Sequence, residues 1–396
     1  MTSDTRTDDR RNETDRYRVY RLFWTALGLR LAVAIVIHLF VTDPYLLAPD
    51  QLTYHAGGRF LASEWSADIP LSRDQVLPSG PRGYFYIVGA IYYIFGSYSI
   101  LPKLLNCLVG ALTIPVVYDL ARKMGANGAA AIRAATYATW FPSLVLWSAL
   151  SIRDPWIILL ILLICRSALV VQARPSLPAM VMLGVGVLAV IQFRSYLLFA
   201  VAGPVVVSFI AQRTRNLPRN LLFGSLVAVV LIYADQAAGE NRRGRFIDLQ
   251  EVQELRYWNT VGASSAFAQV DISTPSRALA FLPEGLVLFL LAPFPWMVGS
   301  IRQVLAVPET LFFYWLIPHM IRGIRHLLRH HPATSLMALL VTAGLTFGYA
   351  LGEGNAGTAY RHRAQLLSFF LIFAAVGIES RREAEQRLTH ALPRTA

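Results

Sequence analysis

The chain has 396 residues, of which 55% are hydrophobic and only 15% are charged, and its mean hydropathy is +0.47. Soluble globular proteins carry roughly 25% charged residues, so this composition excludes an ordinary soluble enzyme. The net charge is +12, but the basic residues are dispersed among short connections between apolar segments. That dispersal argues against nucleic-acid binding and favours loops that lie against membrane headgroups.

The N-terminal region and the two cysteines limit the possibilities further. The first twenty residues are too polar and too acidic for a cleaved signal peptide, and the apolar stretch from Leu22 lacks a small-residue cleavage site. We therefore expect an uncleaved first span after a cytoplasmic tail over residues 1–21. Cys107 and Cys165 both lie inside apolar segments, so the sequence offers neither a disulfide framework nor a cysteine-based zinc site.

Long apolar segments recur along the chain, and an α-helix needs about 20 such residues to cross a bilayer. The sequence predicts an all-α, polytopic transmembrane bundle with these ten clear spans: 22–42, 99–121, 127–149, 155–172, 177–192, 195–211, 219–235, 307–323, 334–351 and 363–379. Two further segments are ambiguous, because 84–95 is short and 278–298 is interrupted by prolines. Either could span or lie in the interface, so the upper limit is twelve spans.

The placement of arginine and lysine orients the bundle, because cytoplasmic loops collect positive charge. With ten spans, the following basic loops all fall on the side of the N-terminus: 122–123, 174, 213–219, 322–329 and 381–387. We therefore expect a single domain over residues 22–379 in the cell (inner) membrane, with a second cytoplasmic tail over 380–396. The outer face then carries two long segments, 43–98 and 236–306.

Charged residues gather at the predicted outer rim, where charge at membrane depth indicates a functional site. They are Asp50, His55, Arg153, Asp154, Arg194, Arg361, His362 and Arg363. Plainer interpretations stay open, since Arg194 can extend from a helix end to the interface and Arg153 can simply neutralise Asp154. For Arg30 and His38, which lie in the first span, we favour a structural role.

Three successive basic residues at 361–363 have only Glu353 as a carboxylate nearby in the sequence. This predicts that an anion holds them, and a lipid phosphate fits best because guanidinium groups match phosphate oxygens. The alternative is nonspecific contact with anionic lipid.

The second long outer segment predicts a lid or an acceptor groove. Residues 247–258 predict a short amphipathic helix with Val252, Leu255 and Trp258 on one side, although plain interfacial packing explains it equally well. The run 289–296 is too rich in proline for a straight span. It can line a cavity at membrane depth or form a kinked helix.

Several short motifs in the first half of the chain carry a family resemblance. An outer loop reads Ala-Pro-Asp-Gln-Leu-Thr-Tyr-His over 48–55, a Pro/Gly/Tyr approach at 81–84 leads to an aromatic helix, and Val-Tyr-Asp-Leu-Ala-Arg-Lys-Met-Gly and Ser-Ile-Arg-Asp follow at 117–125 and 151–154. This order resembles the GT-C superfamily of polyprenyl-phosphate-dependent glycosyltransferases, such as protein O-mannosyltransferases and lipid A aminoarabinose transferases. The resemblance covers residues 20–175, and the second half matches only in general layout.

The resemblance implies a transfer, with inversion, of a sugar from a polyprenyl-phosphate donor to a glycan, lipid or protein acceptor at the outer face. It assigns the main catalytic carboxylate to Asp50 and a second one to Asp154. Protein O-mannosyltransferases have an Asp-Glu pair where this chain has Asp50 and Gln51, so a protein hydroxyl acceptor is not implied.

The chemistry of such a transfer suggests roles for the rim residues. Asp50 would act as general base or metal ligand, and Asp154 would orient the acceptor or share with Asp50 a divalent cation such as Mg, Mn or Zn. Cations would stabilise the departing phosphate. The predicted substrate-binding residues are Tyr54, His55, Arg153, Arg194, Arg361, His362 and Arg363.

Two other classes of function stay open. An O-antigen-type glycan polymerase or ligase also has many spans and outward arginines, and segment 236–306 is compatible with it. A transporter or a non-catalytic component of a polysaccharide export system is the other class. A transporter needs charges deep in the bundle and two related halves, but no internal duplication is visible. Signatures of metalloproteases, ATPases and serine hydrolases are missing from the sequence.

Overall fold

The computed structural model describes residues 2–41, 43, 47–67, 77, 81–194, 197–211, 249–260, 270–296 and 301–391. Within these ranges the chain is helical, with short connections and no β-sheet. The helices are α1 (Thr2–Phe40), α2 (Asp50–Ala67), α4 (Gly83–Phe95), α5 (Ile100–Lys123), α6 (Gly128–Trp140), α7 (Pro142–Ser148), α8 (Asp154–Ala173), α9 (Leu177–Phe193), α10 (Leu197–Ala211), α12 (Leu249–Thr260), α13 (Pro275–Leu291), α14 (Ile301–His330), α15 (Pro332–Gly352) and α16 (Ala356–Ala391). The predicted span 219–235 lies outside the described residues.

The prediction of an all-α membrane bundle is confirmed. Five of the described helices are long and apolar enough to cross a membrane, namely α1, α5, α8, α15 and α16, and each coincides with a predicted span. The apolar helices α4, α9 and α10 are shorter. The ambiguous segment 84–95 forms α4, which has 13 residues and is therefore about 20 Å long, less than the roughly 30 Å of a bilayer core.

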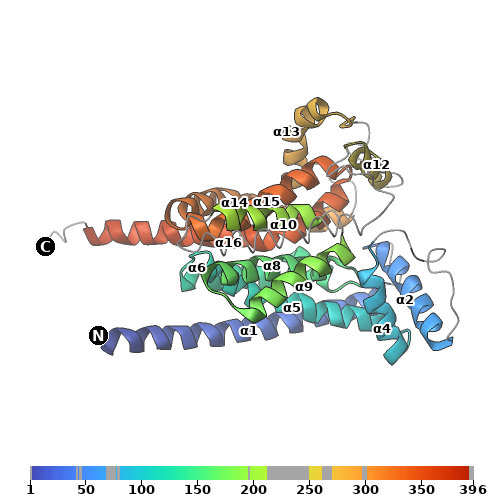
Figure 1. Ribbon diagram of the computed structural model, residues 1–396, viewed down its shortest axis with the longest axis horizontal. Coiled ribbons are helices and arrows are strands. Elements are labelled where there is room, and N and C mark those ends of the chain that lie inside the picture. The colour runs from blue at the N-terminus through green and yellow to red at the C-terminus, as the bar shows by residue number, and fades with distance from the viewer. Residues whose placement is uncertain are drawn as a thin grey trace.

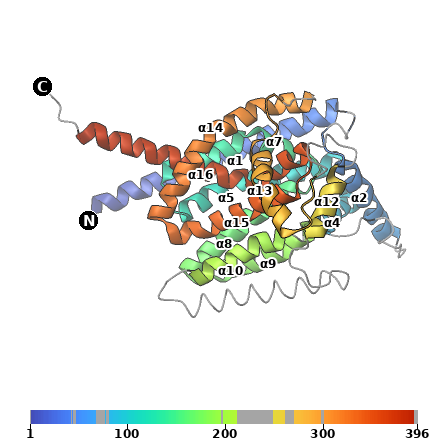
Figure 2. The same cartoon turned by 90° about the horizontal axis from the view of Figure 1, so that it is seen from above.

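Both chain ends lie at one end of the bundle, and α2, α4, α12 and α13 lie at the other (Figure 1). Helix α16 forms the centre of the arrangement. Every residue from 362 to 379 is buried, and the helix packs against α6, α8, α13, α14 and α15. Figure 2 shows the same helix surrounded by its neighbours when the bundle is seen from above. The start of α16 therefore lies inside the bundle, at the end opposite the termini.

A close crossing of two helices fixes α16 in place. Gly323 of α14 lies against the backbone of Phe373, and Gly377 of α16 lies against the carbonyl of His319, so that an added Cβ at either glycine would collide with backbone atoms. Small residues allow such close approach of helices in membranes. The position of α16 along its axis is thus set by backbone contact rather than by flexible side chains.

The predicted span 127–149 is not one continuous helix. The structure divides this segment into α6 and α7 at Phe141, whose backbone is extended with φ −65° and ψ 119°. Pro142 explains the break, because a proline removes a backbone donor and disfavours helical geometry in the residue before it. Arg30 has the predicted structural role, since it is buried in α1 and donates to the carbonyls of Ala138 (3.2 Å) and Thr139 (3.4 Å) near the end of α6.

The amphipathic helix predicted over 247–258 is present as α12. Val252 packs with a small apolar cluster that includes Phe281 of α13, and the guanidinium of Arg256 lies 4.2 Å from the centre of the Phe281 ring. The side chains of Leu255 and Trp258 are outside the described residues. This helix therefore packs against α15 and reaches α13 through these side chains, at the end of the bundle that also carries α2.

Candidate active site

A fully buried carboxylate lies at the start of α8. Asp154 has no exposed surface, and its Oδ2 accepts hydrogen bonds from Nε (2.8 Å) and Nη2 (2.5 Å) of Arg361. Its Oδ1 accepts one from Nε2 of Gln365 (2.8 Å) and lies 3.9 Å from Nη2 of Arg194. The first turn of a helix favours a negative charge. Position, cations and hydrogen bonds together keep Asp154 ionised in the interior.

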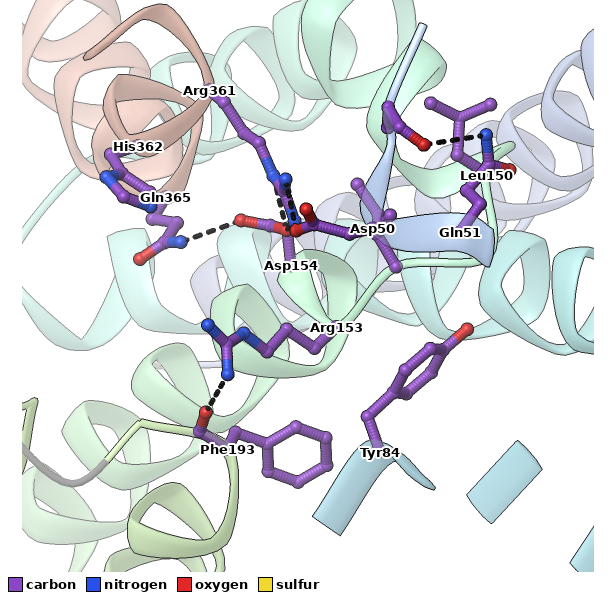
Figure 3. A network of polar contacts seen from close by, with 12 residues as sticks. Asp50, Gln51, Tyr84, Leu150, Arg153, Asp154, Phe193, Arg361, His362 and Gln365 are labelled. Carbon is purple, nitrogen blue, oxygen red and sulfur yellow. Dashed lines mark hydrogen bonds and ion pairs between the residues drawn. The ribbon is translucent and has the colours of Figure 1, made fainter. Parts of the chain in front are cut away.

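Arg361 connects this buried carboxylate to an accessible one. Its Nη1 donates to Oδ2 of Asp50 (2.8 Å) at the start of α2, and Figure 3 shows the guanidinium lying between the two aspartates. The side chain of Asp50 is 45% exposed, whereas that of Arg361 is 12% exposed. Residues from three distant parts of the chain therefore meet, and only Asp50 offers a carboxylate to a substrate.

The charges continue in alternation on the other side of Asp154. Nη1 of Arg194 contacts Nε2 of His362 (2.5 Å), and Nδ1 of His362 contacts the carboxylate of Glu353. Because arginine can only donate, Nε2 must accept, and His362 is then neutral with its proton on Nδ1. Burial raises the pKa of Glu353, but the hydrogen bonds from His362 and Thr358 and the charge of Arg194 outweigh burial and hold this pKa below its ordinary value. This polar chain runs from Glu353 to Asp50.

The plainer interpretations of Arg153 and Arg194 are both wrong. Nη1 of Arg153 donates to the carbonyl of Phe193 (2.9 Å) at the end of α9 rather than to Asp154, as Figure 3 shows. Its Nε is buried and has no hydrogen-bond acceptor in the described part of the chain. Arg194 does not reach the interface, since it is 5% exposed and contacts His362 and Asp154.

Tyr54 and His55 are neighbours in α2 but point to different places. Tyr54 is 5% exposed and packs edge-on against Tyr84 at 4.7 Å between ring centres. Burial raises the pKa of its hydroxyl, which the charges of Arg153 and Asp50 also influence, so the hydroxyl stays protonated beside the cluster. In contrast, Nδ1 of His55 lies 2.8 Å from the hydroxyl of Tyr92 on α4. Only Tyr54 therefore borders the carboxylate pair.

The structure corrects the prediction that residues 361–363 form one cluster held by an external anion. Arg361 is held by Asp50 and Asp154, and His362 by Glu353. The guanidinium of Arg363 is 1% exposed and donates to the carbonyls of Leu290 (2.6 Å) and Ala292 (2.9 Å). The reason is geometric, because a helix turns by about 100° per residue and sends successive side chains in three directions.

Sequence reasoning missed the residues that hold the loop before Asp154. Asn106 of α5 is fully buried, and its Nδ2, which carries two hydrogens, lies 2.7 Å from the carbonyl oxygens of Leu150 and Ile152 and 2.9 Å from the hydroxyl oxygen of Tyr84. Its Oδ1 accepts from Nε1 of Trp156 (2.8 Å). A buried amide inside an apolar span was the available signal, because such groups require partners.

Two glutamines complete the support of the cluster. Oε1 of Gln51 accepts from the backbone N–H of Ser151 (3.2 Å), which ties the residue after Asp50 to the loop before Asp154. Gln365 follows Arg361 by four residues, the spacing that places two side chains on the same helix face. That spacing could have identified Gln365 from the sequence once Arg361 was chosen.

The predicted divalent cation does not fit the two aspartates as they are arranged. Arg361 takes the position between Asp50 and Asp154 that a shared cation would need, and both oxygens of Asp154 already have partners. Among the described residues, no group of three or more histidine, cysteine, aspartate or glutamate side chains could hold a metal ion. We therefore derive no step through Mg, Mn or Zn.

Solved membrane glycosyltransferases share this helical arrangement. ArnT from Cupriavidus metallidurans, solved with undecaprenyl phosphate, matches with a TM-score of 0.52 and 17% identity over 92% of this chain and 62% of that chain. The apo oligosaccharyltransferase from Archaeoglobus fulgidus matches with a TM-score of 0.52 and 13% identity over 93% of this chain and 52% of that chain. AglB from the same organism, solved with an inhibitory peptide and a dolichol-phosphate, matches with a TM-score of 0.50 and 12% identity over 94% of this chain and 52% of that chain.

These similarities establish the fold. The chain has the helical membrane fold of GT-C glycosyltransferases, as the sequence motifs predicted. It spans about three fifths of the length of ArnT and about half of the length of the oligosaccharyltransferases. No protein-family model matches the chain, and a search of curated proteins finds no match either.

Proposed function

We propose that the chain is a membrane glycosyltransferase that moves a sugar from a polyprenyl-phosphate donor to a glycan, lipid or protein acceptor. The observation that carries the proposal is the pairing of an exposed carboxylate with a buried one through Arg361. The ligands of the structural neighbours support it, since ArnT was solved with undecaprenyl phosphate and AglB with a dolichol-phosphate.

Asp50 is the general base in this proposal. Arg361 engages its Oδ2, so Oδ1 can accept the proton of an acceptor hydroxyl. As that proton leaves, the acceptor oxygen forms a bond to the anomeric carbon, and the bond from that carbon to the phosphate oxygen breaks. The bonding electrons go to the polyprenyl phosphate. Attack opposite the departing phosphate inverts the configuration of the anomeric carbon.

The role that we propose for Asp154 differs from the expected one, which was to orient the acceptor or to share a cation with Asp50. Its side chain has no exposed surface, and its oxygens are occupied by Arg361 and Gln365. We therefore assign it to positioning Arg361, so that Arg361 in turn fixes the carboxylate of Asp50. A carboxylate held by a planar guanidinium loses rotational freedom, which favours a reactive alignment.

In this proposal, stabilisation of the departing phosphate falls to Arg153. The buried Nε of Arg153 has no acceptor in the described residues, and its guanidinium lies close enough to influence Tyr54. A donor that lacks a partner in a low-dielectric site interacts strongly with developing negative charge. Tyr54, with its hydroxyl protonated, can donate to the same phosphate or to the sugar.

Donor consumption in nanodiscs tests this function directly. With an undecaprenyl-phosphate sugar and a mixed glycan acceptor pool, we expect the wild type to release undecaprenyl phosphate. Asp50→Asn keeps the size of the side chain but removes the base, so turnover should fall by about 10²-fold or more. Asp271→Asn, a change at an exposed carboxylate paired with Arg277, is the matched control. Near wild-type turnover of Asp50→Asn would remove Asp50 from the mechanism.

The same assay separates an enzyme from a transporter. A nanodisc has no second compartment, so a transporter leaves the lipid-linked sugar unchanged, whereas a transferase consumes it. A glycan polymerase would also consume donor, but it would extend one acceptor by many sugars. Mass spectrometry of the product distinguishes single from repeated transfer.

We further propose that both termini face the cytoplasm and that the candidate site faces the opposite side of the inner membrane. The basic residues at the ends of α14 and α16 support this orientation. The natural cysteines are both buried, so introduced ones can be labelled selectively. A membrane-impermeant maleimide added to whole cells should modify Ser276→Cys but not Ala384→Cys, and the reverse pattern would overturn the orientation.

A further inference from the structure

A polar groove lies between α2 and the end of α4, away from the aspartates. It is a shallow, open depression of about 380 Å³, and its polar lining comes from Arg59, Ser63 and Ser66 of α2 together with Tyr92 and Ser97. The three α2 residues are spaced by four and three positions, which places them on one helix face. The polar side chains of α2 therefore line up along the groove, which Phe60 and Ala62 also border.

The charge in this groove has no counterpart. Arg59 is exposed, and no carboxylate in the described part of the chain pairs with it, although its charge is felt by both His55 and Tyr92. Guanidinium groups bind phosphate oxygens through two parallel hydrogen bonds. Arg59 thus provides an anion site in this open groove.

The serine hydroxyls indicate what else the ligand carries. The hydroxyls of Ser63 and Ser66 donate to the carbonyls of Phe60 (2.8 Å) and Ala62 (2.7 Å) in their own helix. Their oxygens therefore face the groove as acceptors, which suits a ligand with hydroxyl donors. A phosphodiester headgroup that also carries hydroxyl groups satisfies both Arg59 and the serines.

The surface next to the groove is apolar and exposed. Between the lining residues Tyr92 and Ser97, the side chains of Tyr93, Ile94 and Phe95 are 53%, 66% and 64% exposed. Aromatic residues gather where the hydrocarbon of a membrane meets the headgroups. A soluble ion or sugar would not use such a surface, whereas the acyl chains of a lipid would cover it.

We propose that this groove binds an anionic phospholipid with a hydroxylated headgroup, of the phosphatidylglycerol class, with its phosphate on Arg59 and its acyl chains along the end of α4. The site is separate from the proposed transfer reaction. Nine residues separate Asp50 from Arg59, which is two and a half helical turns, so the two side chains lie on opposite sides of α2.

Native mass spectrometry of the delipidated protein in detergent tests the proposal. We expect phosphatidylglycerol to bind about tenfold more tightly than phosphatidylcholine, as one charge-assisted contact would give. Arg59→Gln should abolish this preference, and Arg277→Gln, at another exposed arginine, should retain it. Neither lipid needs to be a substrate, so the result is independent of whether sugar transfer occurs.

Each other outcome counts against the assignment. Equal binding of the two lipids by the wild type, or an unchanged preference in Arg59→Gln, would overturn the site. Loss of preference in both arginine variants would show that total charge alone attracts the lipid. If free glycerol phosphate bound as tightly as phosphatidylglycerol, the groove would be a site for a soluble anion and the lipid assignment would be wrong.

Discussion

Substitution of Arg361 by glutamine should separate the structural role of this residue from its part in the reaction. In Arg361→Gln the fully buried Asp154 keeps its hydrogen bond from Gln365 and its more distant cation Arg194, at 3.9 Å. Breaking a buried ion pair from one side costs about 3–5 kcal/mol. The contact with Asp50 adds about 0–1 kcal/mol at most, because that side chain is 45% exposed. We expect a total loss of about 3–6 kcal/mol.

A double variant supplies the control. In Asp154→Asn/Arg361→Gln both buried charges are removed, and the asparagine oxygen can still accept from Gln365. We expect the double variant to be more stable than the sum of the single changes predicts, by about 2–3 kcal/mol, within the range for contacting residues. Donor consumption should be lost in Arg361→Gln and in the double variant alike, because in both Asp50 has no guanidinium to hold its carboxylate.

Thermal unfolding in detergent and donor consumption in nanodiscs give the two measurements. If Arg361→Gln unfolds at the wild-type temperature, the ion pair with Asp154 is not the structural contact that its burial indicates. If the double variant regains both stability and turnover, Arg361 has no part in the reaction beyond neutralising Asp154, and the positioning role is wrong.

Three further predictions concern other parts of the fold. Asn106→Leu should destabilise the protein by about 3 kcal/mol or more and reduce turnover, because several buried groups lose their partner; thermal unfolding that matches the wild type would contradict this. Gly377→Val should prevent assembly, since the helix backbone at His319 leaves no room, and size-exclusion chromatography should show aggregated protein. Burial and the charge of Arg59 lower the pKa of His55, so stability should fall as pH drops below about 6.5, and less so in His55→Gln.

The helical membrane fold could be predicted because its signal is local. Each long span is a continuous apolar segment, and the order of spans with the short motifs around Asp50 and Asp154 indicated the GT-C arrangement. The division at Phe141 was missed because the apolar run continues across Pro142 without a charged residue. A hydropathy pattern shows the length of an apolar segment, but it does not show whether the helix axis changes direction within it.

The sequence indicated which residues meet at the candidate site better than it indicated which of them pair with one another. Charge at membrane depth drew attention to Asp50, Asp154 and Arg361, and these three residues meet in the structure. The partners could not be predicted, because 207 residues separate Arg361 from Asp154 and proximity in sequence favoured Arg153 instead. Ion pairs across such distances depend on how whole helices pack.

The unequal exposure of the two aspartates follows from where each begins its helix. Asp154 starts α8, a long span that packs against α16, so its side chain enters the interior and must meet cations there to remain ionised. Asp50 starts α2, which lies at the end of the bundle (Figure 1), so its carboxylate reaches solvent while still touching Arg361. A base must contact the acceptor, and a positioning group must stay free of competing water. An aspartate at the start of a helix can therefore suit either task, and the exposure of its carboxylate decides which one.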